Sequence, residues 1–251
     1  SDYDGWAEQG NFGWSFNELL PYFKRSENHE QIDLMDSGYH SSSGELGVTI
    51  PNRFQTPFVD GFIEACAAIG IPKNLDYNGK IQEGASLVQS TIKKGKRESG
   101  ATAFLKPALK RHNLTVITNA RVDKIILEGK NAVGVQYKKG GKTIQVYGQK
   151  EIILSAGTFK SPQLLMLSGI GELSELKNHG IHCIHELKGV GKNLQDHLFY
   201  PICAQSKTQE GINHYISPFN QIRAAWNYFV NKKGVFCNSP LEGMAFFDLD
   251  Q

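Results

Sequence analysis

The sequence lacks closely spaced cysteines, long apolar runs and a large excess of charge of either sign. Its four cysteines form no Cys-x-x-Cys pair, which excludes a zinc knuckle or dithiol centre of that pattern, and we predict no metal site. No apolar run approaches the roughly 20 residues of a membrane-spanning helix, and the first residues do not resemble a secretory signal peptide. A formal net charge of +2 is too small to gather nucleic acid, so no nucleic-acid partner is expected.

What the sequence does contain is typical of a packed globular chain. It has 251 residues, of which 40% are hydrophobic and 21% charged, enough to bury a large core without disulfides. An Asn113-Leu114-Thr115 triplet would permit glycosylation of a secreted parent protein. The residues of this chain name no compartment.

Two helices near the N-terminus are predicted from their capping residues. Ser15 and Glu18 have the spacing of a capping box, which opens a helix that continues through Phe23. Thr56-Pro57 opens a second helix, which ends at Gly70. Its apolar face is expected to form core, and it carries Phe58, Val59, Phe62 and Cys66. Four aromatic residues are also expected to anchor the core: Trp6, Trp14, Tyr22 and Phe23.

The rest of the chain is predicted to mix helix and strand, so the fold class is α/β with mixed α+β character. Ser99 opens a helix, and strand-like segments joined by glycine turns then form a small antiparallel meander. Residues 152–154 are apolar on both faces, which predicts a strand buried in a parallel sheet. Near the C-terminus, residues 219–232 have helical spacing. The strand-like segments are 114–117, 122–127, 133–137 and 144–146.

The segment from Gly157 to Gly171 follows the predicted buried strand and is the densest local signal. Ala156 and Gly157 leave the end of that strand without side-chain bulk, so another backbone or a ligand can approach closely. Ser161 and Pro162 start a short helix that Gly169 ends. Two interpretations stay open on these grounds: a tight strand-turn-helix that serves packing alone, or a ligand site beyond the carboxyl end of a strand.

The same segment matches, position by position, the second signature of the glucose-methanol-choline (GMC) family of FAD-dependent oxidoreductases, so the chain resembles that family. Three further stretches agree in order: Tyr3 to Lys24, Arg97 to Pro107, and Gly189 to His197. The loop from Tyr39-His40 to Gly47, together with Asn78-Gly79, resembles the insect branch, in which glucose dehydrogenase-like members are numerous.

The resemblance implies a GMC-type FAD/NAD(P)-binding fold and an enzyme that oxidises the CH–OH group of a donor. The cofactor would be FAD and the partner a small-molecule alcohol or sugar substrate, while these residues name no electron acceptor. In relatives a hydrophobic residue on a strand holds the adenine through its backbone, and that position falls on Val122. Ala156 and Gly157 are expected near the adenosine or pyrophosphate, and Asn193 in a turn that closes the flavin domain. No residue is assigned a catalytic role.

The resemblance further implies that the chain is an internal fragment of a longer protein. The family's Gly-rich phosphate loop and catalytic histidine find no match here, so we expect the chain alone to be colourless and inactive. Its expected parts are a connecting region at 1–92, part of a FAD-binding domain at 93–197, and the start of a substrate-binding domain at 198–251. The alternative hypothesis is a non-catalytic, truncated or degenerate relative that acts as a scaffold or binding protein.

Overall fold

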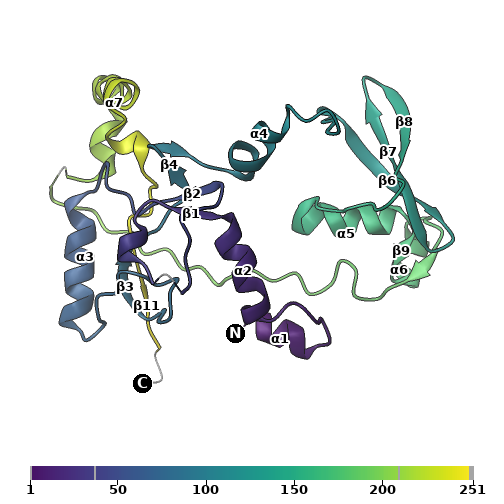
Figure 1. Cartoon of the computed structure of the whole chain (residues 1–251), viewed down its shortest axis with the longest axis horizontal. Helices are drawn as coiled ribbons and strands as arrows, with labels where there is room; N and C mark the ends of the chain where they lie inside the picture. The colour runs from purple at the N-terminus through teal and green to yellow at the C-terminus, as the bar shows by residue number, and fades with distance from the viewer. Residues whose placement is uncertain (1, 37, 209, 249–251) are drawn as a thin grey trace. The chain divides into compact units, whose positions relative to one another are not determined.

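A computed structural model describes residues 2–36, 38–208 and 210–248 and shows two compact units (Figure 1). The first unit comprises the chain up to Leu114 together with the chain from Ala204 onward, and the second unit is Thr115–Cys203. Both helices and strands are present, so the predicted mixed α and β class is confirmed. The compact units describe packing, whereas the predicted parts 1–92, 93–197 and 198–251 describe domains of a parent protein and stay a prediction.

The first unit packs short sheets among helices from both ends of the chain (Figure 1). Its β1 and β2 pair in parallel, whereas β4 pairs with β5 and β11 with β3 in antiparallel fashion. Its helices are α1 (Asp2–Glu8), α2 (Phe16–Ser26), η1 (Ile32–Leu34), α3 (Pro57–Ala68), the π-helix η2 (Ala101–Leu105), α4 (Lys106–Ala108), η3 (Ile212–Ile216), α7 (Pro218–Asn231) and η4 (Val235–Cys237). Its strands are β1 (Glu27–His29), β2 (Leu46–Val48), β3 (Gly84–Leu87), β4 (Ile92–Lys93), β5 (Lys96–Arg97) and β11 (Gly243–Phe246).

The predicted helix starts of the first unit are confirmed. The Glu18 carboxylate accepts hydrogen bonds from the backbone amide of Ser15 at 3.1 Å and from its hydroxyl at 2.6 Å, at the start of α2. Pro57 is the first residue of α3, although the Thr56 hydroxyl donates to the carboxylate of Glu242 instead of capping the helix. The helix that follows Ser99 begins with the π-helix η2.

Acid is expected to release the capping contact of α2. The Ser15 hydroxyl, followed by the Ser15 amide, holds the pKa of Glu18 below its ordinary value of 4.5. Because the pKa is lowered in the folded state, the contact stabilises α2 above pH 4.5 and is lost as the pH falls through the folded pKa. The Ser15 amide signal in NMR should therefore titrate with a midpoint below 4.5. Glu18→Gln keeps the acceptor and should abolish the titration, and a midpoint above 4.5 would contradict this prediction.

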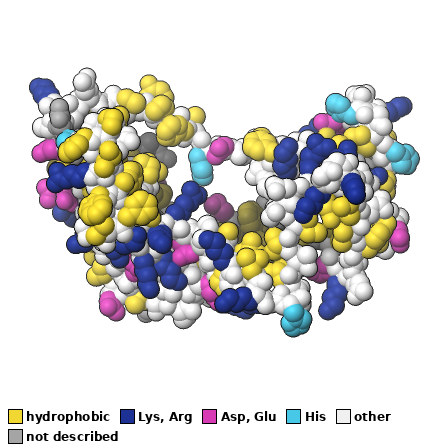
Figure 2. All heavy atoms as spheres, turned by 90° about the horizontal axis from the view of Figure 1, so that it is seen from above, with side chains coloured by type: hydrophobic (Ala, Val, Ile, Leu, Met, Phe, Trp, Pro, Cys, Tyr) yellow, Lys and Arg dark blue, Asp and Glu magenta, His cyan; other side chains and the backbone are white. Residues whose placement is uncertain are grey.

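The predicted core face of α3 and the aromatic anchors are only partly buried. Val59 and Cys66 are buried in α3, but the four aromatic residues named as anchors are exposed, from Phe23 at 42% to Tyr22 at 64%. Instead of entering a core, several of them pack on one another at the surface, and Trp6 lies 5.3 Å from Tyr3 and 5.8 Å from Trp14, measured between ring centroids. Exposed hydrophobic side chains are visible in Figure 2. The prediction that these rings anchor the core was wrong for the described chain.

The second unit is built on the predicted antiparallel meander. Its strands β6 (Arg121–Glu128), β7 (Asn131–Lys139) and β8 (Lys142–Tyr147) pair in sequence order, with glycines of positive φ in both connections. The helix α5 (Gly157–Leu167) packs against β6 (Figure 1). Side chains of Ile125, Tyr137, Leu164 and Leu176 are buried in its core. The remaining elements are β9 (Ile170–Gly171), α6 (Leu173–Asn178) and β10 (His185–Glu186), which pairs in parallel with β9.

Two predicted strands are absent from the described chain, and one helix starts earlier than expected. Residues 114–117 and 152–154 are not in strands, and Ile153 is 81% exposed, so the prediction of a buried strand was wrong here. A strand needs a neighbour for its amides and carbonyls, and no described segment pairs with either stretch. Helix α5 begins at Gly157 rather than at Ser161, whose hydroxyl accepts from the Ala156 amide at 3.1 Å.

Among the described residues, no helix combines the length and apolar character that crossing a membrane requires.

Candidate functional site

The second unit contains a groove between β6 and α5 that brings together two of the predicted site residues. Val122 lies on the strand wall and Ala156 at the start of the helix wall, so the two share one hollow of about 710 Å³. Gly157 follows Ala156 directly but is not one of the lining residues. The complete lining is Arg121, Val122, Asp123, Ala156, Lys160, Gln163, Leu164 and Leu167.

A break in the strand register explains why three consecutive residues of β6 reach this groove. In a regular strand, side chains alternate between the two faces, so neighbours in sequence point in opposite directions. The pairing of β6 with β7 shifts between Val122, which faces Tyr137, and Lys124, which faces Gln136. Asp123 is therefore an extra residue in the strand, as in a β-bulge, and such bulges re-aim side chains. The irregularity makes the strand wall partly polar.

Charged groups at the strand wall are paired in a small exposed network. The Asp123 carboxylate lies 3.3 Å from Nε of Arg121 and 3.7 Å from Nζ of Lys138. On the helix wall, Nζ of Lys160 donates to the side-chain carbonyl of Gln163 at 3.0 Å. Because the lining holds two cationic side chains and one carboxylate, the groove favours a polar ligand that carries negative charge.

The helix wall is a stripe of residues with helical spacing. Lys160, Gln163, Leu164 and Leu167 lie three or four positions apart in α5, so they share one face. Leu164 is buried and Leu167 is exposed. This spacing can be recognised in the sequence, and it would have predicted that these four residues share a face. No such pattern marks Asp123, because the bulge has no distinct sequence signature.

The start of α5 offers an open backbone surface. Gly157 has a φ of +85°, and a Cβ built on it would meet no atom within 4 Å. The first turn of a helix leaves backbone amides without intrahelical partners, and these attract anionic oxygen atoms. A phosphate or sugar hydroxyl can therefore approach Gly157 more closely than any residue with a side chain would allow.

Asn193, the fourth predicted site residue, lies in a separate turn of the second unit. It is exposed, has a φ of +56°, and is not a lining residue of the groove. Its neighbour Lys192 forms ion pairs of 2.8 Å with Glu175 in α6 and 3.0 Å with Glu172, the residue before α6. Glu175 and then Glu172 raise the pKa of Lys192, and Lys192 in turn lowers the pKa of Glu172. These contacts position the turn, and a cofactor role for Asn193 stays a prediction.

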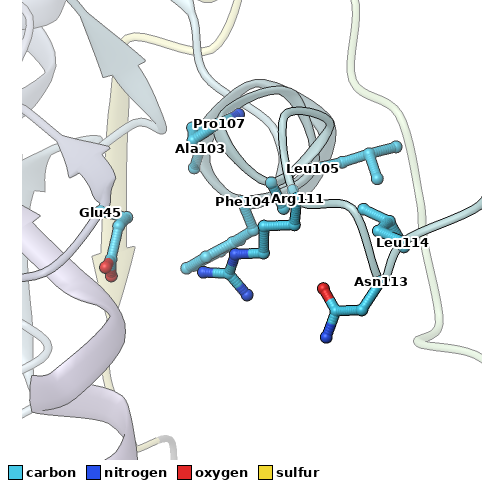
Figure 3. Close-up of a pocket in the computed structure, with 10 residues that line it drawn as sticks. Glu45, Ala103, Phe104, Leu105, Pro107, Arg111, Asn113 and Leu114 are labelled. Atoms are coloured by element: carbon cyan, nitrogen blue, oxygen red, sulfur yellow. The ribbon is translucent and has the colours of Figure 1, made fainter.

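A second hollow of about 590 Å³ lies in the first unit, around η2 and α4. Phe104 and the Arg111 guanidinium extend toward the side on which Glu45 lies (Figure 3). The matched stretch from Arg97 to Pro107 contributes much of its wall, but none of the predicted site residues lies in it. The groove of the second unit is therefore the candidate site.

Two choline dehydrogenases match most of the chain. It is 40% identical over 249 residues to the oxygen-dependent choline dehydrogenase of Photobacterium profundum, covering 98% of this chain and 43% of that protein. It is 45% identical over 197 residues to the mitochondrial choline dehydrogenase of Homo sapiens, covering 78% of this chain and 32% of that protein. The chain thus spans less than half the length of these relatives.

A solved structure of an FAD-dependent oxidoreductase has a similar fold. The FAD-dependent oxidoreductase from Chaetomium thermophilum superposes with a TM-score of 0.83 at 28% identity, over 96% of this chain and 44% of that one. Residues 1–199 match the family described as GMC oxidoreductase. FAD is therefore the cofactor that family and fold indicate, as the sequence predicted. The chain belongs to the GMC oxidoreductase family.

Proposed function

We propose that the groove between β6 and α5 binds the adenosine half of FAD in an oxidoreductase that acts on the CH–OH group of a small alcohol. The observation that supports this most directly is the meeting of Val122 and Ala156 in one groove. The family resemblance singles out both residues from the sequence alone, without reference to their distance in space. A hollow of about 710 Å³ falls within the range of small-molecule sites, roughly 300–1,000 Å³.

Each wall of the groove has a part in holding the nucleotide. We assign the adenine to the strand wall, where Val122 lies on the edge strand β6, with Leu164 and Leu167 as apolar surface on the helix wall. The ribose and pyrophosphate would lie toward Ala156 and Gly157, where no Cβ obstructs the backbone of the glycine. When bound, FAD supplies the group that accepts the hydride, and the residues of this chain bind and orient its nucleotide end.

The substrate proposed first is choline or a similar small alcohol. Both relatives named above are choline dehydrogenases, and choline carries the CH–OH group that the family resemblance implies. A sugar donor, and with it the glucose dehydrogenase-like placement, is the second hypothesis. A protein that carries this chain within the full length of its relatives, loaded with FAD, should show bleaching of its flavin by one of these donors. If no member of an alcohol and sugar panel bleaches it, the proposed activity is wrong and the scaffold hypothesis is favoured.

Filling the groove should weaken nucleotide binding by the chain itself. We expect the isolated chain to be colourless, so ADP is the probe for the adenosine site. Ala156→Trp places a large ring in the hollow and should weaken ADP binding more than tenfold, which corresponds to about 1.4 kcal/mol or more. Calorimetry or NMR titration measures the change. Ala132→Trp, at an exposed position of β7, is the control and should bind as the unmodified chain does. Equal affinities for all three chains would refute the assignment of the groove.

A further inference from the structure

Ser168 joins the two walls of the groove through its side-chain hydroxyl, although it lines no part of the groove itself. It is only 5% exposed and follows the last residue of α5. Its hydroxyl accepts from the backbone amide of Ile125 in β6 at 2.8 Å and donates to the carbonyl of Leu164 in α5 at 2.5 Å. One hydroxyl therefore contacts both elements.

The position of β6 in the sheet gives this contact its importance. The sheet order is β6-β7-β8, so β6 is an edge strand, and amides on an edge have no neighbouring strand on one side. Ile125 is buried, and a buried amide without an acceptor destabilises the folded state. The Ser168 hydroxyl provides that acceptor, and it does so from the end of the helix that forms the opposite wall of the groove.

The contacts of Ser168 lie next to the residues that form the groove. Leu164, whose carbonyl accepts from Ser168, is itself a lining residue. Ile125 is three residues beyond Val122, just past the break in the strand register. At the other end of α5, the Ser161 hydroxyl accepts from the amide of Ala156. Both ends of the helix wall are thus held by serine hydroxyls, and the hydroxyl of Ser168 links that wall to the strand wall.

We propose that Ser168 is a positioning residue for nucleotide binding, because it fixes α5 against β6 at the spacing that the groove requires. This inference rests on the proposed function, since it takes the groove to be the adenosine site. It assigns Ser168 no contact with the ligand. Loss of the hydroxyl should therefore act on affinity through the spacing of the two walls.

The test compares Ser168→Ala with Ser168→Thr in the full chain, using ADP as the probe. Without the hydroxyl, the Ile125 amide should exchange its hydrogen about tenfold to hundredfold faster, as the loss of one buried hydrogen bond predicts. ADP should bind at least about tenfold more weakly to Ser168→Ala, with smaller NMR shifts at Val122 and Ala156. Ser168→Thr keeps a hydroxyl that can bond to the carbonyl four residues earlier, and it should restore most of the affinity. Ser174→Ala removes an exposed hydroxyl of α6 and is the matched control.

The outcomes separate this inference from the proposed function. If the unmodified chain shows no ADP-dependent shift at Val122 or Ala156, the adenosine assignment fails first. If the unmodified chain binds and Ser168→Ala binds equally well, while its Ile125 amide exchanges faster, the positioning role is refuted. Should Ser168→Ala not fold, Ser168→Cys of similar volume replaces the hydroxyl by a weak acceptor. That variant should bind more weakly than the unmodified chain, and equal binding would again refute the proposal.

Discussion

Replacing His40 with leucine is expected to destabilise the first unit by about 3–5 kcal/mol, the cost of removing one partner from a buried ionic network. His40 is buried, with Nδ1 at 3.0 Å from both carboxylate oxygens of Glu27 and Nε2 at 3.0 Å from Oδ1 of Asp76. A leucine of similar size leaves both carboxylates without this donor in a largely buried place. Urea unfolding followed by tryptophan fluorescence measures the loss, because Trp6, Trp14 and Trp226 all lie in the first unit.

The two ring nitrogens of His40 connect the carboxylates of Glu27 and Asp76. Glu27 also accepts from the Ser41 amide, and Asp76 from the Asp36 amide, so the network joins β1 to two loops. A control replaces the exposed His112 of the same unit with leucine and should change stability by less than about 0.5 kcal/mol. If His40→Leu lowers the free energy of unfolding by less than about 1 kcal/mol, the carboxylates form hydrogen bonds with other donors.

His29 lies beside His40 and is also buried. The rings are 5.6 Å apart between centroids, and Nδ1 of His29 accepts from the amide of Gln31 at 3.1 Å. Burial lowers the pKa of His29, and the charge of His40 lowers it further, whereas Glu27 and Asp76 oppose the shift. In the described chain, Nε2 of His29 is buried without a hydrogen-bond partner. Burial therefore disfavours the charged form of His29.

Local signals in the sequence were enough to predict the elements whose contacts join residues that are close together in the chain. The strands 122–127, 133–137 and 144–146 fold into a meander because glycine turns bring sequence neighbours together. Capping residues placed the starts of α2 and α3 for the same reason, since each cap acts within a few residues. The strand predicted at residues 152–154 does not form, because a parallel strand needs partners that are distant in the sequence. The apolar composition of the segment does not reveal whether such partners are present.

The candidate site shows the same limit to local reasoning. Val122 and Ala156 came from the family resemblance, and only the packing of α5 on β6 shows that they share a groove. Asp123 enters the lining through a shift of strand register, which depends on the pairing with β7. Ser168 was visible as part of a motif, but its contact with Ile125 joins residues 43 positions apart. Periodicity along the chain carries no information about a contact of that range.

Replacing Gly169 with alanine is expected to destabilise the second unit far more than the same change at Gly157. Both glycines have a φ of +85°, in the left-handed region where an alanine is strained by about 1–2 kcal/mol. They differ in the space around them. A Cβ on Gly157 meets nothing within 4 Å, whereas a Cβ on Gly169 lies 2.6 Å from the carbonyl oxygen of His182.

The contact at Gly169 cannot be relieved by a side-chain movement, because the obstructing atom belongs to the backbone. The Gly169 carbonyl also accepts from the amides of Ile184 and His185, so displacing this segment disturbs the pairing of β9 with β10. Overpacking of this kind adds about 1–3 kcal/mol to the strain, which puts the total for Gly169→Ala at about 2–5 kcal/mol. Amide exchange of the buried Leu176 reports the stability of this unit, which contains no tryptophan. If the two variants lose equal stability, backbone strain is the whole effect at Gly169, and the segment around His182 moves away without a free-energy penalty.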